Sequence, residues 1–374
     1  MTRDRRGGSI RQLTTRQLWE ARYVGADGRR HSIYARTERE AQERLRAAQA
    51  AADHGVRPVG QRLTVGAFLD DWLATSVQAR CRPSTARSYR ETVERYIRPA
   101  VGRVPLAKLE PEHVQRMLVD LTARGDLSST TVRYAYAVLR IALGRALKGG
   151  KAIRNVATLV DPPAKARTEL HPLTVEHVTT FRAALSGDRL EALYLVAIGT
   201  GLRQGEILAL RWSDVDLDAG TLTVRHTLER LTRTLVEPKT PGSRRTVGLP
   251  LPVTAALHRW QRRQAQERER ARVWDARGFV FSTREGRPLE SRNVTQGLQA
   301  VLLAAALPRQ RFHDLRHAFA TLQLEAGAEL LEVSRALGHS DIGTTANVYA
   351  HWTDAMAART ADRMTAILGA GGAD

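Results

Sequence analysis

The sequence has little cysteine and little lysine. Cys81 is the only thiol in 374 residues, which excludes an intramolecular disulfide and any metal site built from several thiolates. A reducing compartment fits this composition. Lysine supplies only five of the 58 basic residues, so arginine carries nearly all of the positive charge. Where lysine does occur, its position does not simply follow the general preference of this chain for arginine.

Long apolar runs are also missing. The first residues, MTRDRRGGS, offer no apolar stretch for a secretion signal. The longest apolar runs, at 190–198 and 300–307, are far shorter than the roughly 20 residues that span a bilayer. We therefore expect a cytoplasmic protein without membrane segments.

Acidic residues are scarce relative to basic ones. Asp and Glu number 39 against 58 Lys and Arg, which leaves a net charge of +19 and a pI near 11.0. Such an excess opposes folding and is tolerated when phosphates neutralise it, so nucleic acid is the expected partner. The alternative explanation of the positive charge is a codon bias towards arginine, but such a bias alone would not leave the acidic residues so outnumbered.

Three segments with different patterns divide the chain. A chain of this length favours two or three domains. Gly and Pro interrupt the helical and the strand-like repeats of apolar residues at 54–60 and at 161–163, which indicates linkers. We expect domains at 1–60, 63–160 and 170–374.

The first segment predicts a small module of strands and one helix. Alternation at 17–23 and 30–35, on either side of a Gly-containing turn, predicts a β-hairpin. Thr37 and Glu40 have the spacing of a capping box, which starts an Ala-rich helix that ends near residue 53. The segment holds 13 arginines against 7 acids, which fits an accessory DNA-binding module and also an ordinary solvated surface.

Helices dominate the rest of the chain. In the second segment, apolar spacing predicts a small bundle of four helices, at 65–75, 84–96, 112–124 and 129–147. The third segment mixes helices with one β region, whose strands are expected at 221–228, 233–237 and 244–249. The fold class is therefore mainly α with small β elements in a multidomain chain.

Two basic side chains of the third segment are candidate site residues. Glycines at 199–201 break the chain before a helix, so we expect Arg203 at a helix N-terminus, where backbone N–H groups and the helix dipole favour an anion. Lys239 lies in the turn between two strands and is the only lysine after Lys165. An ammonium whose pKa is lowered can donate a proton, whereas a guanidinium can hardly do so. Taken singly, either residue could be an ordinary surface residue.

Two later clusters add histidine, arginine and tyrosine. His313, Arg316 and His317 are three and four residues apart, so one helix face can bring them to one ligand. A glycine ends one helix just before His339, and the helix expected next carries Tyr349. Each histidine, and the tyrosine, could alone be a buried structural residue.

Together these residues predict one kind of chemistry. Two arginines, a lysine, two histidines and a tyrosine are what metal-free attack on a phosphodiester needs, with the tyrosine as nucleophile. The two arginines hold the non-bridging phosphate oxygens and stabilise the charged transition state without Mg²⁺.

The order and spacing of these residues resemble the tyrosine recombinases of the phage integrase type. The motifs of that family are matched here by Gly201-Leu202-Arg203 with Glu206, Lys239, His313 with Arg316, Leu337-Gly338-His339, and Thr344-Thr345 followed by Tyr349-Ala350-His351. The resemblance covers most of the chain and every catalytic position. It implies an arm-binding domain, a helical core-binding domain that clamps DNA, and a mixed α/β catalytic domain of the DNA breaking-rejoining type.

The resemblance also implies a role for each residue. Tyr349 attacks the scissile phosphate and forms a 3′-phosphotyrosyl link, and Lys239 is the general acid for the departing 5′-oxygen. The two arginines bind the phosphate, His313 is the base or orienting group for the tyrosine, and His339 donates a hydrogen bond to a phosphate oxygen. Because the covalent link conserves the energy of the phosphodiester, neither ATP nor a metal or other cofactor is needed.

The partners follow from the same resemblance. A homotetramer would act on two double-stranded DNA attachment sites, together with a DNA-bending accessory protein and an excision factor. The reaction would integrate or excise a mobile element such as a prophage or an integrative plasmid, at the nucleoid of a bacterium.

Three other functions fit parts of the pattern. The segment from His313 to His317 resembles a His-Glu-x-x-His zinc motif with Asp in place of Glu, although Arg316 would then share a helix face with a dication. A non-catalytic DNA-binding regulator would need the basic surface but neither Tyr349 nor Lys239. A type IB topoisomerase would share the chemistry but would need no second DNA site.

Overall fold

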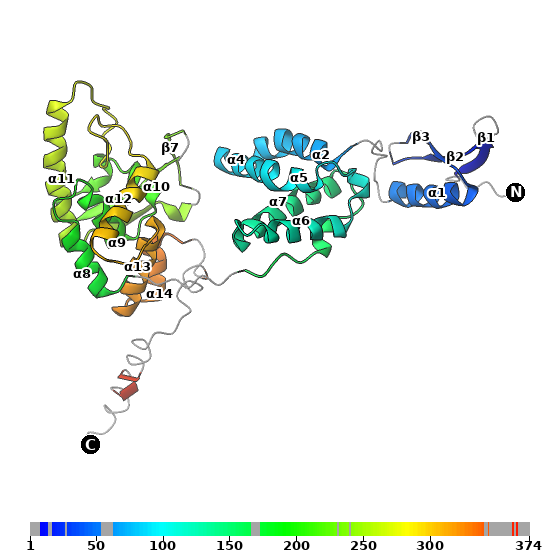
Figure 1. Ribbon diagram of the computed structural model, residues 1–374. Helices are drawn as coiled ribbons and strands as arrows, with labels where there is room; N and C mark the ends of the chain where they lie inside the picture. The colour runs from blue at the N-terminus through cyan, green and yellow to red at the C-terminus, as the bar shows by residue number, and fades with distance from the viewer. Residues whose placement is uncertain are drawn as a thin grey trace, which may run out of the picture. The chain divides into compact units, whose positions relative to one another are not determined.

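The computed structural model describes residues 8–13, 17–26, 28–53, 63–165, 173–229, 232–238, 241–339, 343, 361–362 and 364–365. The chain forms two compact units, residues 1–168 and 169–374 (Figure 1). The first unit contains two hydrophobic clusters that share no residue, and the predicted linker at 54–60 between them lies outside the described residues. The second unit has a core of its own. No helix in these described ranges is long and apolar enough to cross a membrane.

The N-terminal part is a three-stranded antiparallel sheet with one helix packed on it. The strand order is β1–β2–β3, and the elements are β1 (Ser9–Leu13), β2 (Leu18–Val24), β3 (Arg30–Ala35) and α1 (Glu38–Asp53). The predicted hairpin and helix are confirmed, and the Glu40 N–H donates to Thr37 Oγ1 at 3.2 Å, as the predicted cap requires. The structure adds β1, which the sequence did not predict because its residues hardly alternate between polar and apolar.

A helical bundle follows, and it contains the four predicted helices. Its elements are α2 (Val65–Trp72), η2 (Leu73–Val77), α3 (Gln78–Arg80), α4 (Pro83–Thr92), η3 (Val93–Ile97), α5 (Arg98–Val101), η4 (Leu106–Lys108), α6 (Pro111–Ala123), α7 (Ser129–Lys148) and η5 (Val156–Leu159). The segments η2 and η3 are π-helical turns inside longer helices. Thr75 and Thr92 donate to the carbonyls of Asp71 and Ser88, four residues earlier, which loosens a helix at such points.

The second unit is mainly helical with a small β region (Figure 1). Its helices are α8 (Val175–Ala184), α9 (Glu191–Thr200), α10 (Gln204–Ala209), α11 (Leu251–Arg270), α12 (Ser291–Ala304), α13 (Phe312–Glu325) and α14 (Leu330–Leu337), with short 3₁₀ turns at η6 (Trp212–Asp214) and η7 (Pro241–Ser243). One antiparallel sheet has the order β4–β5–β8, and a separate hairpin pairs β6 with β7. These strands are β4 (Val215–Asp216), β5 (Thr221–Val224), β6 (Thr227–Leu228), β7 (Leu235–Val236) and β8 (Arg245–Gly248).

The predicted strand at 221–228 was wrong in one respect, because the structure divides it into β5 and β6. Val224 pairs with Arg245, which is the first residue of β8, so no partner strand remains for the residues that follow. The chain then leaves this sheet at Arg225 and His226 and enters the β6–β7 hairpin. The predicted strands at 233–237 and 244–249 are confirmed as β7 and β8 with shorter bounds.

Helix α9 lies at the centre of the second unit. Residues 192–198 are all buried, so the helix has no polar face and needs neighbours on all sides. Helices α10, α11 and α13 contact it, and the Tyr194 hydroxyl donates to the carbonyl of Val294, on α12, at 2.9 Å. The helix ends at Gly201, whose φ of +63° is left-handed. The position of the residues after Gly201 is therefore determined by the core of the unit.

We expect Gly201→Ala to destabilise the second unit more than the same substitution at a glycine whose surroundings leave room for a Cβ. A Cβ at Gly201 would lie 2.6 Å from Phe319 Cδ1 and 2.7 Å from Leu337 Cδ2. The left-handed backbone costs a non-glycine residue about 1 kcal/mol, and overpacking adds about 2 kcal/mol. Gly187, with φ +82° and no atom within 4 Å of its Cβ position, is the matched control. Urea unfolding should give losses of about 3 kcal/mol for Gly201→Ala and about 1 kcal/mol for Gly187→Ala, and equal losses would contradict this account.

Candidate active site

Arg203 lies at the junction where α9 ends and α10 begins. It is the N-cap of α10, as predicted, and its backbone is extended. Its backbone N–H donates to Glu206 Oε2 at 3.0 Å, and its guanidinium Nη1 donates to Glu206 Oε1 at 2.9 Å. The Arg203 side chain is 39% exposed and that of Glu206 only 3%. A buried carboxylate therefore holds a guanidinium at the surface.

Arg316, on α13, joins the ends of two other helices. Its side chain is buried, with Nη1 donating to the carbonyl of Gly201 and Nη2 to the carbonyl of Leu337, both at 2.8 Å. These carbonyls lie at the C-terminal ends of α9 and α14, where helical hydrogen-bond partners are lacking and the helix dipole is negative. Arg316 therefore brings the start of α10, which carries Arg203, close to the end of α14.

The end of α14 is a tight turn that presents His339. Gly338 has φ +66°, and the His339 N–H donates to the carbonyl of Ser334 at 3.1 Å, in the manner of a left-handed helix end. A Cβ at Gly338 would lie 3.0 Å from Arg245 Nη1, and its positive φ would strain any other residue. The turn thereby places His339 within reach of the positive charge of Arg316 and Arg203.

Both histidines of the predicted set are neutral at pH 7. Desolvation lowers the pKa of His313 to about 4, although part of the residue is exposed, and repulsion from His317 and Arg316 adds to the shift. Desolvation also lowers the pKa of His339 to about 4, and the charges of Arg316 and Arg203 add to it. A neutral imidazole can accept a proton at one nitrogen and donate a hydrogen bond from the other.

The structure brings together four of the six predicted site residues, namely Arg203, His313, Arg316 and His339. The other two, Lys239 and Tyr349, lie outside the described residues, as does the segment 344–351 that surrounds the tyrosine. The four described residues combine two cations with two neutral imidazoles. Such a group can bind an anion, and it can also donate a proton to that ligand or accept one from it.

Sequence reasoning missed Arg245, which also belongs to this group. Its guanidinium donates to Glu206 Oε2 at 3.0 Å, and its charge acts on His339. A signal was present in the sequence, because Arg245 alternates in phase with Val247 and Leu249 and therefore falls on the buried face of β8. An arginine at such a position indicates a buried partner of opposite charge.

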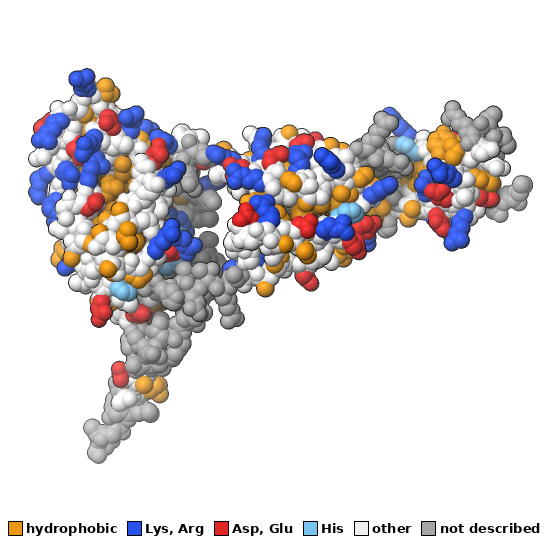
Figure 2. Space-filling model, in the orientation of Figure 1, with side chains coloured by type: hydrophobic (Ala, Val, Ile, Leu, Met, Phe, Trp, Pro, Cys, Tyr) orange, Lys and Arg blue, Asp and Glu red, His pale blue; other side chains and the backbone are white. Residues whose placement is uncertain are grey.

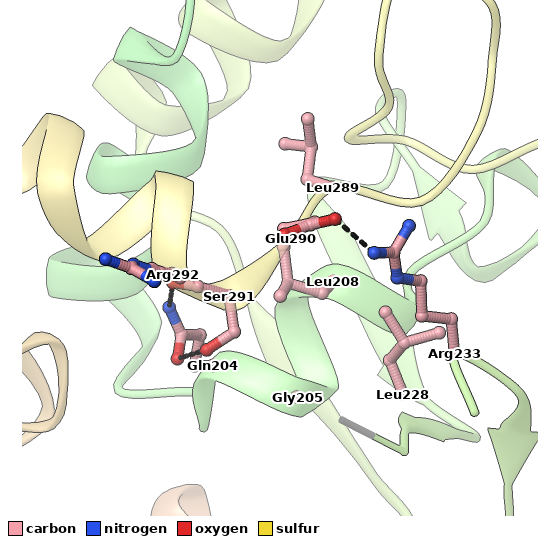
Figure 3. Close-up of a pocket in the computed structure, with 9 residues that line it drawn as sticks. All are labelled: Gln204, Gly205, Leu208, Leu228, Arg233, Leu289, Glu290, Ser291 and Arg292. Atoms are coloured by element: carbon pink, nitrogen blue, oxygen red, sulfur yellow. Dashed lines mark hydrogen bonds and ion pairs between the residues drawn. The ribbon is translucent and has the colours of Figure 1, made fainter. Parts of the chain in front are cut away.

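A cavity of about 390 Å³ adjoins the first turn of α10 (Figure 3). Gln204, the residue after Arg203, lines it and accepts a hydrogen bond from Ser291 Oγ at 2.6 Å. Arg233, from the β6–β7 hairpin, forms an ion pair with Glu290, which precedes α12. The surface beside Arg203 therefore combines leucine side chains with polar side chains that have fixed partners.

The zinc alternative rests on His313 and His317, which lie four residues apart on α13. The rings of His313 and His317 stand edge to face, with centroids 4.9 Å apart and an angle of 89° between their planes. Among the described residues, no group of three His, Cys, Asp or Glu side chains is arranged to hold a metal ion.

Comparison with known proteins identifies the family. The model of the phage integrase family matches residues 173–356, and the model of the N-terminal SAM-like domain of phage integrases matches residues 64–121. A XerC-like tyrosine recombinase of Caldanaerobacter subterraneus subsp. tengcongensis is 30% identical, over 86% of this chain and 88% of its own length.

Solved structures share the fold. The Tn1549 transposon integrase in complex with transposon right end DNA superposes with a TM-score of 0.69 at 21% identity, over 81% of this chain and 100% of that one. A lambda integrase tetramer bound to a Holliday junction gives a TM-score of 0.56 at 18% identity, over 89% of this chain and 95% of that one.

The fold and the family match define a tyrosine recombinase. The chain belongs to the phage integrase family, and it is a site-specific DNA recombinase.

We expect the free energy of unfolding of the second unit to fall as the pH falls from about 7 to about 4. The pKa values of His313 and His339 are about 4 in the folded protein and about 6.5 when unfolded, so the unfolded chain binds more protons in this interval. The two histidines contribute fully to the free energy of unfolding above pH 6.5, and this contribution is lost as the pH falls towards 4. Urea midpoints measured across this range should show a shallower pH dependence for His339→Gln than for the wild type. Parallel curves would count against a depressed pKa at His339.

Proposed function

We propose that Tyr349 cleaves DNA by attacking the scissile phosphate, within a site formed by Arg203, His313, Arg316 and His339. The observation that carries the proposal is the junction at Gly201 and Leu337, where Arg316 ties together the ends of α9 and α14. Because Arg203 begins α10 just after one of these ends and His339 lies just after the other, we infer that Arg203, His339 and the buried guanidinium of Arg316 act on one ligand. A phosphodiester with its two non-bridging oxygens fits this arrangement.

In the proposed reaction, atoms and charges balance without a cofactor. The Tyr349 oxygen forms a bond to phosphorus while the bond from phosphorus to the 5′-oxygen breaks, which leaves a 3′-phosphotyrosyl link. His313, neutral at pH 7, accepts or orients the phenolic proton, and Lys239 donates a proton to the 5′-oxygen. Arg203 and Arg316 stabilise the negative charge that the attack adds to the phosphate, and His339 donates a hydrogen bond to one of its oxygens. The 5′-hydroxyl of a partner duplex reverses these steps.

We propose that the rest of the chain positions DNA for this reaction, with a core-binding domain at 63–160 and an arm-binding domain at 1–60, ahead of a catalytic domain at 170–374. In support, the SAM-like family match falls within the helical bundle. Lys and Arg side chains are also widespread on the face of the second unit seen in Figure 2.

The open face of the N-terminal sheet supports the arm-binding assignment. Glu20 accepts hydrogen bonds from Arg11 Nε at 2.6 Å and from Ser32 Oγ at 2.9 Å, and its Oε1 lies 3.1 Å from Arg22 Nε. Arg22 is the main cause that lowers the pKa of Glu20 to about 2, so the carboxylate is charged at any physiological pH. It holds two arginines in place on a sheet face that is not covered by α1, and a DNA backbone is a ligand for such arginines.

Assembly and partners belong to the same proposal. Strand exchange needs two cleaved duplexes, and the tetramer of lambda integrase on a Holliday junction supports a homotetramer acting on two attachment sites. A DNA-bending accessory protein and an excision factor would set the direction in which a mobile element moves. We also propose that the enzyme works in the bacterial cytoplasm at the nucleoid, since its DNA substrate lies there.

Tyr349→Phe should abolish formation of a covalent protein–DNA adduct. Nicked duplexes tiled across the DNA that flanks the gene, incubated in EDTA and run on a denaturing gel, should show the adduct with wild-type protein only. The variant should still bind the reactive duplex, since only the nucleophilic oxygen is lost.

Three outcomes would contradict the assignment. An adduct formed by Tyr349→Phe would contradict the choice of nucleophile, and an adduct seen only with added metal would contradict the metal-free mechanism. Relaxation of supercoiled plasmid at random sites, without strand exchange, would favour the topoisomerase alternative.

Arg22→Met should weaken binding to DNA outside the cleavage site and reduce its salt dependence. Loss of one phosphate contact lowers the slope of log K against log salt by about 1. Arg39→Met is the matched control, because Arg39 is 90% exposed on α1 and pairs with Glu43. Filter binding of the full chain to the tiled duplexes measures both slopes, and equal slopes for the two variants would rule out a role for this sheet face.

A further inference from the structure

Arg245 is a buried charge to which the proposed reaction assigns no role. Its side chain is 7% exposed, and it shares the inner face of β8 with Val247 and Leu249. A buried guanidinium is costly unless its N–H groups find acceptors and its charge finds a counter-charge. The partners of Arg245 therefore show what it stabilises.

Its first partner is Glu206, the carboxylate that also holds Arg203. Arg245 Nη2 donates to Glu206 Oε2 at 3.0 Å, and Arg245 Nη1 lies 3.5 Å from Oε1. The same two oxygens accept hydrogen bonds from the backbone and from the guanidinium of Arg203. Burial alone would raise the pKa of Glu206, but Arg245 and Arg203 outweigh it and hold that pKa below its usual value. One charged carboxylate is thus shared by two guanidinium groups.

Its other partners lie in two further elements. Arg245 Nε donates to the carbonyl of Ala336 at 2.6 Å, in the last turn of α14, three residues before His339. Arg245 Nη1 donates to the carbonyl of Ser243 at 3.1 Å, in the turn η7 that leads into β8. The same side chain therefore connects the start of α10, the end of α14 and the turn before β8.

Building on the proposed function, we propose that Arg245 is a positioning residue that keeps Arg203 available to the scissile phosphate. Because Arg245 shares the charge of Glu206, Arg203 is held by the carboxylate without being neutralised by it. Without Arg245, Glu206 would be a buried anion with Arg203 as its nearest cation, and a closed pair between the two would form. Arg203, Arg245 and Arg316 against Glu206 leave two net positive charges at the site, whereas without Arg245 one remains. The charge lost is needed when the attack adds negative charge to the phosphate.

The alternative is that the ion pair of Arg245 with Glu206 is purely structural. The second unit contains a comparable structural pair. Arg189 pairs with Glu267 through Nε at 2.9 Å and Nη2 at 2.6 Å, and Nη2 also donates to the carbonyl of Ser282. Both side chains are largely buried, and neither contacts a predicted site residue in any hydrogen bond or ion pair of the described structure. Arg189→Met therefore reports what the loss of a structural Arg–Glu pair does.

The experiment compares Arg245→Met with Arg189→Met in single-turnover formation of the covalent adduct, on the duplex that the wild type cleaves. At saturating protein, Arg245→Met should form the adduct about 100-fold more slowly, the size of effect expected when one stabilising donor is lost. Its affinity for the duplex should change less than about threefold, since most of the phosphate contacts are elsewhere. Arg189→Met should lower the melting temperature by about as much as Arg245→Met does, but it should form the adduct at the wild-type rate.

Neutralising Glu206 supplies a readout that a structural role would not give. In the Arg245→Met background, Glu206→Gln removes the unshared charge and retains an oxygen that can accept the Arg203 N–H. The double variant should therefore react about tenfold faster than Arg245→Met alone, although both changes remove native contacts. A double variant slower than either single variant would overturn the proposal, because losses that accumulate indicate structural damage only.

Arg245→Lys covers the case in which Arg245→Met does not fold. It keeps the charge but cannot reach both Glu206 and Ala336 with one planar group, so we expect a rate about tenfold below wild type with near-normal melting. A wild-type rate for Arg245→Lys or Arg245→Met, with the wild-type adduct present, would overturn the role of Arg245 alone. No adduct from the wild type on any duplex would instead count against the proposed function.

Discussion

The buried carboxylate of Glu206 allows several arginines to occupy one small site. Two like charges about 4 Å apart repel by about 4 kcal/mol at the effective dielectric constant of a protein surface, so a cluster of guanidinium groups opposes its own assembly. Glu206 offsets this repulsion by accepting hydrogen bonds from both Arg203 and Arg245, and it is itself held in its charged form by them. The site thus retains a net positive charge without an unpaired buried ion.

Helix ends, more than helix bodies, form the rest of the site. Gly201 and Gly338 both adopt left-handed backbone conformations, which end α9 and α14 and leave carbonyls without helical partners. Arg316 takes one such carbonyl from each end, at Gly201 and Leu337. A single buried guanidinium therefore satisfies carbonyls at two buried helix ends and also sets the distance between the residues that follow them. Stability and ligand geometry depend on the same hydrogen bonds.

Much of the fold and part of the site could be predicted from local patterns. Helices α6 and α7 and the cap at Thr37 follow from apolar spacing and from residues with strong positional preferences. The pattern did not indicate the π-helical turns, because the threonine hydroxyl bonds beside them leave the apolar spacing unchanged. It did not indicate the break between β5 and β6 either, because that break depends on where the partner strand β8 begins. It also missed Arg245, because strand alternation places this side chain on the inner face of β8 but does not show that Glu206, far away in the chain, lies opposite it.

The sequence by itself determined the class of protein, a tyrosine recombinase, and the residue types that we propose for its site. Composition, motif order and the spacing of the six candidate residues, Lys239 and Tyr349 included, were sufficient for this, because reactive groups and their local helix positions are properties of short segments. Only the tertiary structure decided that Glu206 is shared between Arg203 and Arg245, that Arg316 bonds to two helix ends, and that both histidines have lowered pKa values. These features arise from desolvation and from charges far apart in the chain, and such interactions exist only once the core has brought the segments together.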